Sequence, residues 1–362
     1  MDLERSILRI IRGEKKAPLA KAALAALSVV YRTAIAARNF AYDRRWASST
    51  RLPALVISIG NLAVGGTGKT PFVHLLTSQL QEKMKLAILT RGYRSEIEKS
   101  GKSRLVSSGN GPLYPPQECG DEPYFLAQKI QAPIWVGPDR IASGRLAIEQ
   151  GAQCLILDDG MQHRRLDRDV EIVVIDARDP FSKGRFLPWG LLRDSPKRLQ
   201  AADLIVFSHV QDLDHYKQAQ KQISHYSNAP TIATQIEVKN KCNITYCKVG
   251  VFCGIGNPGR FLQTVRDLKY EIVDTLLLKD HEPVQYQQLR KFAERCREQG
   301  AELLLCTEKD YVKLRPDLSL YLKIVPVEIQ LQIIAGKEHW ENLIEKVLDR
   351  ITNERRNQSI IA

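Results

Sequence analysis

The chain has 362 residues, enough for about two domains with well-buried cores. Its 53 lysines and arginines exceed its 41 aspartates and glutamates, and the resulting charge of +12 favours an anionic partner such as a nucleotide, a nucleic acid or an acidic membrane. The seven cysteines are scattered, and Cys242 and Cys247 lack the second pair or the histidines of a zinc site, which argues against a zinc module and favours reduced thiols in a cytosolic protein.

The first 50 residues are expected to form a separate helical region. Residues 1–51 contain eleven basic and four acidic residues, so they carry more than half of the excess charge. Residues 17–47 are rich in alanine and leucine and lack glycine, which favours a long helix. The uncharged stretch 22–31 is about half the length that a bilayer needs, and no convincing signal-peptide cleavage site follows. Such a helix is typical of an anchor at a membrane surface, although an ordinary helix packed on a sheet can have the same composition.

A strand that leads into a glycine-rich loop is predicted at 54–70. The segment ALVISIGNLAVGGTGKT is followed by a predicted helix at about 71–84. This is the order of a Walker A motif, in which backbone N–H groups surround the phosphates, a lysine reaches the transferring phosphate and a hydroxyl ligates Mg²⁺. One departure is that Ala63 stands where the first glycine is usual. We expect a nucleoside triphosphate to bind the loop residues Ala63, Val64, Gly65, Gly66, Thr67, Gly68, Lys69 and Thr70.

The rest of the chain alternates between short apolar strands and helices. Strands are expected at 86–90, 134–136, 154–157, 171–176, 204–207, 249–253, 303–306 and 324–329, and helices are expected from Asp121, at 140–150 and at 337–355. The polar segment 95–120 is expected to be a mobile loop, and 211–247 shows no clear pattern. The alternation predicts an α/β fold with a parallel sheet that is covered on both faces and binds ligands at the carboxyl ends of its strands.

Two carboxylates end the strand at 154–157. Asp158 and Asp159 follow the apolar Leu155-Ile156-Leu157, which is the Walker B pattern. An aspartate at this position can hold Mg²⁺ directly or through water, next to the threonine of the glycine-rich loop. Gln162 and His163 add polar groups at the same edge, although His163 can equally be a structural residue of the loop.

Two further acidic or histidine pairs have roles that the residues alone leave open. Asp121 and Glu122 start a predicted helix, so they can be helix-capping residues, or a catalytic base and a second metal ligand. Asp280 and His281 lie in a predicted loop, where a histidine beside a carboxylate can act as a base or have a structural role.

Three arginines are candidates for anion binding. Arg91 and Arg140 each follow a predicted strand, which places them at the active edge of the sheet. Arg193 ends the segment LPWGLLR (187–193), which is too apolar for an ordinary surface loop. An arginine there can neutralise charge on a γ-phosphate, as arginine fingers do, although each of the three can also be a solvated surface residue.

Taken together, these motifs resemble the tetraacyldisaccharide 4′-kinase family of the lipid A pathway. The matching segments, in order from about residue 15 to 330, are VGGTGKTP (64–71), TRGY (90–93), GDEP (120–123), DDGMQH (158–163), LPWGLLRD (187–194), GIGNP (254–258), DH (280–281) and TEKD (307–310). The resemblance implies that ATP, with Mg²⁺, phosphorylates the 4′-hydroxyl of a tetraacylated glucosamine disaccharide 1-phosphate. It also implies that the basic N-terminal helix docks on the cytoplasmic face of the inner membrane.

The resemblance implies roles for individual residues. It makes Asp121 the catalytic base with His281 as its partner, and it adds Lys69 and Arg193 at the phosphates. The expected Mg²⁺ ligands are Thr70, Asp158 and Glu122, and the expected substrate-binding residues are Arg91, Arg140, Asp159 and Gln162. Members of the family usually carry a second histidine after the Asp-His pair, whereas this chain has Glu282.

The resemblance also implies a P-loop domain combined with a second, smaller α/β domain. We expect a membrane-docking helical region at 1–50, a P-loop kinase domain at 51–169 with residues 332–362 packed back on it, and the second domain with its linker strands at 170–331. The expected partners are the lipid substrate and the inner-membrane surface, with no nucleic acid and no obligate protein partner.

Two other classes of protein fit the sequence less well. A membrane-associated partitioning-type ATPase would carry a signature lysine in the loop where this chain has Val64. A nucleic-acid-binding module would combine a basic stripe with interleaved aromatic residues, but aromatic residues make up 7% of the chain and the charge is concentrated on the alanine- and leucine-rich helix. Both observations favour the kinase.

Overall fold

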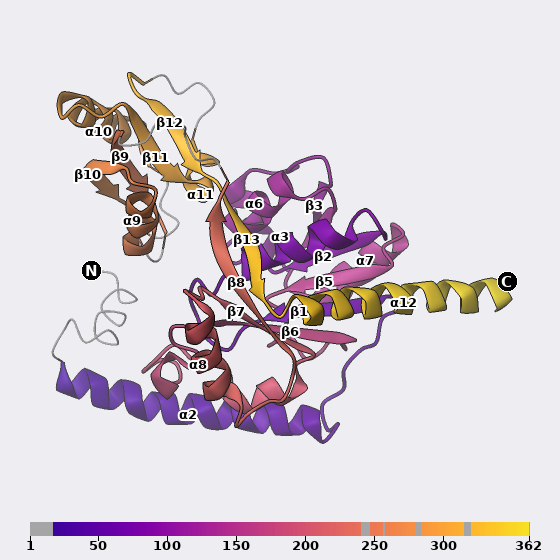
Figure 1. Cartoon of the computed structure of the whole chain (residues 1–362). Coiled ribbons are helices and arrows are strands. Elements are labelled where there is room, and N and C mark those ends of the chain that lie inside the picture. Colours follow the sequence, from indigo (N-terminus) through magenta and orange to yellow (C-terminus); the bar gives the residue numbers. More distant parts are fainter. Residues whose placement is uncertain (1–16, 240–246, 256–257, 280–283, 315–319, 362) are drawn as a thin grey trace.

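A sheet of nine strands organises most of the chain (Figure 1). The computed structural model describes residues 17–239, 247–255, 258–279, 284–314 and 320–361, without the side chains of 354–361. In spatial order the strands are β13 (Ile329–Ala335), β8 (Thr231–Val238), β7 (Leu204–Ser208), β6 (Val170–Asp176), β1 (Leu55–Gly60), β5 (Cys154–Asp158), β2 (Leu86–Thr90), β4 (Pro133–Val136) and β3 (Arg104–Ser108). Strands β8 to β4 run parallel, and the edge strands β13 and β3 are antiparallel to their neighbours.

Helices cover both faces of this sheet, which explains why every residue of β1 is buried. One face packs against α3 (Lys69–Leu80), α6 (Asp121–Lys129) and α12 (Lys337–Ile361), and Phe72 of α3 meets Trp340 of α12 edge to face. The other face packs against α7 (Arg140–Glu149) and α8 (Leu213–Ile223). The order of the strands places the loops after β1, β2 and β5 next to one another at the carboxyl edge.

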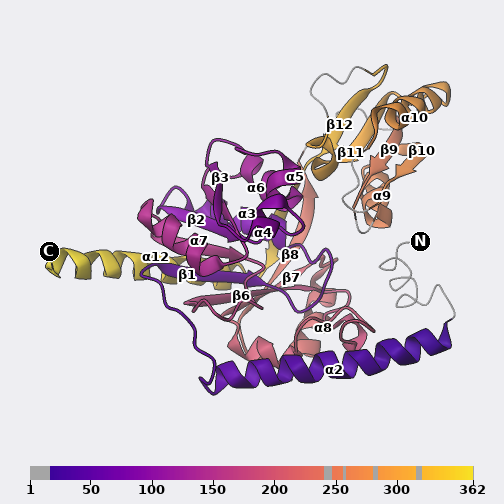
Figure 2. The ribbon, with the colours of Figure 1, turned by 180° about the vertical axis from the view of Figure 1, so that it is seen from behind.

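A smaller, fully parallel sheet forms a second unit (Figure 2). Its order is β10 (Glu271–Leu277), β9 (Lys248–Cys253), β11 (Leu303–Thr307) and β12 (Lys323–Val327). Helices α9 (Pro258–Asp267), α10 (Tyr286–Glu298) and the short α11 (Glu308–Tyr311) accompany these strands. The long antiparallel pair of β8 and β13 leads from the large sheet to this unit and back, with Val238 opposite Ile329.

The chain opens, within the described residues, with α2 (Pro18–Asp43), which lies along the large unit beside α8 in both views (Figures 1 and 2). It is the one described helix that is long and apolar enough to cross a membrane by length and composition, with a mean hydropathy of 1.4 and 11% of that window buried. The expectation of a helix here is confirmed. The helix as a whole is more apolar than the uncharged stretch 22–31 alone indicated.

Several expected boundaries differ from the structure. The division at residue 170 is wrong, because β6, β7 and β8 belong to the large sheet and the small sheet spans 248–327. The segment 95–120 is not a continuous loop: it contains α4 (Glu96–Ser100), the edge strand β3 and α5 (Pro116–Cys119). The helix expected at 71–84 is α3, which begins at Lys69 and ends at Leu80, and the unplaced 211–247 contains α8 and β8.

Candidate active site

The loop after β1 has the backbone of a phosphate-binding loop. Gly65 and Gly68 have φ angles of 122° and 82°, and Gly68 immediately precedes α3. Gly68 is favoured for two reasons: its φ is in the left-handed region, and a β-carbon there would lie only 3.2 Å from the side chain of Ser208. Asn61 Nδ2 donates to Thr67 Oγ1 at 2.9 Å, which ties the end of the strand to the loop. A glycine-rich loop that leads into the N-terminus of a helix is the arrangement that binds phosphate.

The first part of the loop pairs with the apolar segment 187–193. Ala63 forms an antiparallel bridge with Leu192, and the N–H of Val64 donates to Leu191 O at 2.8 Å. Ala63, at the position of the missing glycine, is therefore part of a short β-contact. Through this contact the loop and the segment that carries Arg193 are held side by side.

Lys69 and Arg193 share one carboxylate, Asp159. Lys69 Nζ lies 3.3 Å from Asp159 Oδ1, and Arg193 donates to both carboxylate oxygens at 2.6 and 2.8 Å. A second Arg193 contact goes to the side-chain oxygen of Asn61. Burial would raise the pKa of Asp159, but the two cations outweigh burial and lower the pKa well below its ordinary value. Asp159 is therefore an anion that holds two cations beside the loop.

Asp158 lies in the opposite electrostatic situation. Its side chain is buried at the end of β5 and accepts a hydrogen bond from Thr90 Oγ1 at 3.3 Å. Burial, and then the negative charges of Glu122 and Asp159, raise the pKa of Asp158 to about 7. A nearby cation would stabilise the ionised form of a carboxylate in this position.

The residues around Asp158 fit Mg²⁺, although the described residues contain no group of three or more histidine, cysteine, aspartate or glutamate side chains in metal-binding geometry. Thr70 Oγ1 lies 3.4 Å from Glu122 Oε1, so a hydroxyl and a carboxylate face each other beside the loop. Lys309 lies 3.3 Å from Glu122 and lowers the pKa of this carboxyl. Mg²⁺ is usually held by one or two carboxylates together with phosphate oxygens and water, which is the donor set that these oxygens offer.

Asp121, the expected base, begins α6 and lies 3.2 Å from Lys313 Nζ. Asp121 directly precedes Glu122, whose carboxylate lies 3.4 Å from Thr70 Oγ1 at the end of the phosphate-binding loop. His281, its expected partner, and the adjacent Asp280 and Glu282 lie outside the described residues.

The expected substrate-binding arginines differ in exposure. The side chain of Arg91 is 60% exposed and its Nε lies 2.5 Å from Glu98. Arg140 is only 3% exposed and donates to Gly137 O at 2.9 Å. Burial lowers the pKa of Arg140 to about 10, and the charge of Asp158 partly offsets that effect. Arg140 is thus built into the edge of the sheet and is not a solvated surface arginine.

Buried polar side-chain atoms of Arg140 and of the loop after β5 have no hydrogen-bond partner among the described residues. Gln162 Nε2 donates to Asn61 O at 3.0 Å. Among the contacts of the described residues, Gln162 Oε1, His163 Nε2 and Arg140 Nε have no hydrogen-bond partner despite their burial. Burial, and then the charges of Arg140 and Arg168, lower the pKa of His163 to about 4, so its ring is neutral near pH 7.

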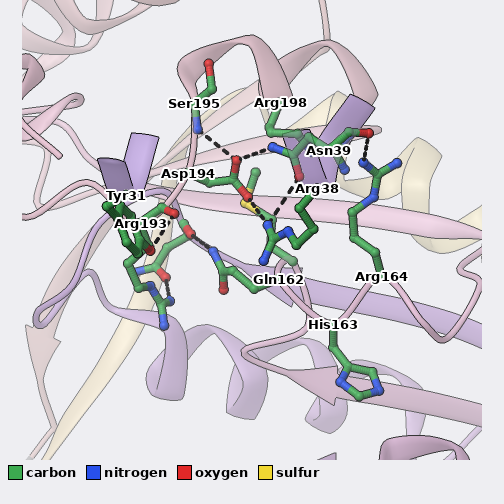
Figure 3. Close-up of polar contacts among 12 residues, drawn as sticks. Tyr31, Arg38, Asn39, Gln162, His163, Arg164, Arg193, Asp194, Ser195 and Arg198 are labelled. Atoms are coloured by element: carbon green, nitrogen blue, oxygen red, sulfur yellow. Dashed lines mark hydrogen bonds and ion pairs between the residues drawn. The ribbon is translucent and has the colours of Figure 1, made fainter. Parts of the chain in front are cut away.

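Helix α2 contacts the arginine segment directly (Figure 3). Tyr31 donates its hydroxyl proton to Arg193 O at 3.0 Å. Asp194 is completely buried and accepts hydrogen bonds from Asn39 Nδ2 at 2.7 Å and from Arg38 at 3.0 Å. The helix expected at the membrane therefore forms hydrogen bonds with the backbone of Arg193 and with the side chain of Asp194.

Some residues of the site were not singled out from the sequence. They are Asn61, Asn39, Tyr31, Asp194, Lys309 and Lys313. Asn61 directly follows β1 and could have been found from that position. Asp194 and Lys309 lie in segments that carry the family resemblance. Their partners, like those of Asn39, Tyr31 and Lys313, are distant in the sequence, and a single sequence does not indicate such pairs.

The fold and the site define a P-loop nucleotide-binding protein: a central strand, a glycine-rich loop before a helix, and acidic residues at the end of the adjacent strand. Residues 20–349 match the profile of the family described as tetraacyldisaccharide-1-P 4′-kinase. The chain belongs to this family, as the resemblance predicted.

Individual relatives agree with this assignment. The chain is 35% identical to the tetraacyldisaccharide 4′-kinase of Syntrophus aciditrophicus, over 90% of this chain and 93% of the relative. It is 34% identical to that of Chlamydia pneumoniae, over 86% of each chain. It also resembles the crystal structure of the apo form of LpxK from Aquifex aeolicus in complex with ATP, with a TM-score of 0.71, 28% identity and coverage of 92% of this chain and 99% of that one.

Proposed function

We propose that this chain transfers the γ-phosphate of ATP to the 4′-hydroxyl of a tetraacylated glucosamine disaccharide 1-phosphate, which yields the precursor of lipid A. The observation that supports this most is the joint pairing of Lys69 and Arg193 with Asp159 beside the glycine-rich loop. Two cations at that point suit a transferring phosphoryl group, whose oxygens carry the charge of the transition state.

The loop and the two cations act on the nucleotide. Backbone N–H groups of the glycine-rich loop contact phosphate oxygens, while Lys69 and Arg193 stabilise charge on the phosphoryl group as it leaves ADP. Thr70, Glu122 and Asp158 would hold Mg²⁺, which would supply further charge neutralisation at the phosphates.

Asp121 receives the proton of the sugar hydroxyl as the phosphoryl group is transferred. A hydroxyl is a weak nucleophile, so a carboxylate within hydrogen-bond reach accelerates its attack. The position of Asp121 beside Glu122 and the loop supports this role. His281 is its expected partner and orients or tunes the carboxylate.

The lipid headgroup binds at the edge formed by Arg91, Arg140 and Gln162. Polar atoms of Arg140 and Gln162 that have no hydrogen-bond partner among the described residues support a polar ligand there. Asp159, the fourth expected substrate-binding residue, is already held by Lys69 and Arg193, and a direct contact with the sugar stays a prediction.

Helix α2 docks the enzyme on the cytoplasmic face of the inner membrane. The exposed large apolar residues of this helix are Leu19, Leu27, Val29, Val30 and Phe40, and Trp46 is exposed just beyond its end. The opposite contacts, from Ser28 to Phe186 O and from Asn39 to Asp194, hold it against the body of the protein. A helix bonded along its length in this way lies on a bilayer and does not cross it.

The direct test is incubation of the purified chain with ATP, Mg²⁺ and tetraacyldisaccharide 1-phosphate, followed by mass spectrometry of the lipid. We expect one added phosphate in the wild-type reaction and in a Lys83→Ala control, whose lysine is exposed beyond the end of α3. Lys69→Ala should form product about a thousandfold or more slower than the wild type. ATP hydrolysis without lipid phosphorylation would instead support a partitioning-type ATPase.

The membrane proposal has its own test, which is co-sedimentation with vesicles that contain acidic lipid. Removal of residues 1–45 should release the protein from the vesicles while ATP binding persists. High salt should weaken binding of the full chain only in part, because salt screens the basic residues and not the apolar burial. Unchanged sedimentation of the truncated chain would show that the helix is structural.

A further inference from the structure

The short helix α11 of the small unit contacts both ends of α6, the helix that carries Asp121 and Glu122. Glu308 forms an ion pair with Lys129 at the last residue of α6. At the other end, Lys309 Nζ lies 3.3 Å from Glu122 Oε1, and Lys313 Nζ, two residues beyond α11, lies 3.2 Å from Asp121 Oδ2. We call these three ion pairs the α11–α6 contact.

The pair between Lys313 and Asp121 is the most enclosed pair at the catalytic end of this contact. The side chain of Lys313 is 9% exposed and that of Asp121 is 21% exposed, whereas Lys309 and Glu122 are 34% and 47% exposed. An exposed ion pair contributes little to position or stability, because water and salt screen it. A partly buried lysine that faces a carboxylate is different, since removal of one charge leaves the other poorly solvated.

Lys313 is itself held by the fold of the small unit. Its Nζ lies 3.9 Å from Asp310 Oδ1, and the other Asp310 oxygen accepts hydrogen bonds from Thr307 Oγ1 at 2.6 Å and from the N–H of Gly254 at 3.0 Å. Asp310 is 3% exposed. The ammonium group therefore lies between a fixed carboxylate of the small unit and Asp121 of the large unit.

We infer that Lys313 is a positioning residue for phosphoryl transfer, which aligns Asp121 through an ion pair across the two units. This inference rests on the proposed function, and specifically on Asp121 as the base. Lysine donates from a compact ammonium group, so one lysine can bond two carboxylates that face it from different units. The base is then held in its working orientation when α11 is in contact with α6, and misorientation of a reacting group is costly.

A double-mutant cycle on kcat tests this inference, because a residue that acts through Asp121 has nothing left to align once Asp121 is gone. The variants are Lys313→Met, Asp121→Asn and the double variant, assayed with ATP and tetraacyldisaccharide 1-phosphate. We expect Lys313→Met to lower kcat about tenfold or more while KM for ATP changes by less than about twofold. In the Asp121→Asn background, the same change should cost less than about twofold.

Two further variants separate alignment from simple attachment of the units. Lys129→Met removes the pair with Glu308 at the opposite end of α6, and it should leave kcat within about twofold of the wild type even if its Tm falls. Lys313→Arg keeps the charge and should recover most of the lost kcat. If Lys313→Met does not fold, which its Tm would show, Lys313→Gln takes its place in the cycle.

Any one of three results overturns the inference. They are an equal loss of kcat from Lys313→Met in both backgrounds, a kcat of Lys313→Met within twofold of the wild type, and a loss of kcat in Lys129→Met equal to that in Lys313→Met. Full activity of Asp121→Asn would remove both the base and the role of Lys313, while the kinase function would stand. Absence of phosphorylated lipid from the wild-type reaction would overturn the proposed function itself.

Discussion

The hydrogen bond between Asn39 and Asp194 should control how firmly α2 is attached to the catalytic unit. Asp194 is fully buried, and its Oδ1 accepts from Asn39 Nδ2 at 2.7 Å and from the N–H of Ser195 at 2.8 Å (Figure 3). A hydrogen bond to a charged group contributes about 1.5–3 kcal/mol, so Asn39→Ala should raise the opening equilibrium of α2 by about ten- to a hundredfold.

Hydrogen–deuterium exchange of peptides from α2 measures this opening directly, because backbone amides exchange when a segment detaches and frays. Thr33→Ala is the matched control: Thr33 Oγ1 bonds Val30 O on the exposed side of the same helix, and its loss should change exchange by less than about threefold. Wild-type exchange in Asn39→Ala would refute the assigned strength of the buried bond.

A charge exchange makes the test more specific. Asn39→Asp places a second carboxylate against Asp194, and like charges at this distance should loosen the helix more than Asn39→Ala does. Adding Asp194→Asn restores one amide and one carboxylate beside Arg38, so the double variant should be more protected than Asn39→Asp alone. Additive losses in the double variant would show that the two side chains do not depend on each other.

Further predictions concern the nucleotide site, acid stability and thiol reactivity. Lys69→Ala should lower kcat about a thousandfold, and Thr70→Ala should need more Mg²⁺, both measured by steady-state kinetics; a Mg²⁺ titration of Thr70→Ala that overlays the wild type would contradict the ligand assignment. Because the pKa of His163 is about 4 in the folded chain and about 6.5 in the unfolded chain, the unfolded state binds more protons between these values, and stability falls as pH drops through this range. At pH 5 this effect lowers the free energy of unfolding by at most about 2 kcal/mol, and by less once solvent screening of the partly exposed ring is included. The Tm of His163→Gln should therefore fall less between pH 7.5 and pH 5 than the Tm of the wild type. Native alkylation with iodoacetamide at pH 8 should be slow at the six described thiols, which are reduced and buried: Cys119, Cys154, Cys247, Cys253, Cys296 and Cys306. Rapid labelling of any of them would contradict their placement.

The phosphate-binding loop and the acidic pair could be predicted because their signals are local. Gly68-Lys69-Thr70 and Asp158-Asp159 each follow an apolar strand, and parallel strands bring such ends to one edge of the sheet. The pairing of Lys69 with Asp159 then follows from the adjacency of β1 and β5. Sequence reasoning was sufficient here since the chemistry lies within a few residues of a strand end.

The division into units could not be read in the same way. Strands β6 and β9 have similar apolar sequences, and nothing local shows that one joins the large sheet and the other the small sheet. Strand β3 was missed because an edge strand that pairs on one side needs only a short apolar core, here Leu105 and Val106. The pairs of Lys309 and Lys313 with α6 join distant parts of the chain and depend on how the two units meet.

Two adjacent aspartates acquire different roles because the backbone separates them. Asp158 continues β5 and is buried, whereas Asp159 has a φ of 56°, a left-handed conformation that costs of order 1 kcal/mol for a residue with a β-carbon. The turn directs Asp159 toward Lys69 and Arg193, whose charges keep it ionised and offset that strain. Asp158 lacks such a pair among the described residues and has a pKa of about 7, so its charge is fully developed only beside an added cation. The strained residue thus holds the two cations of the phosphate site, and the proposed function assigns the regular one to Mg²⁺ together with Thr70 and Glu122.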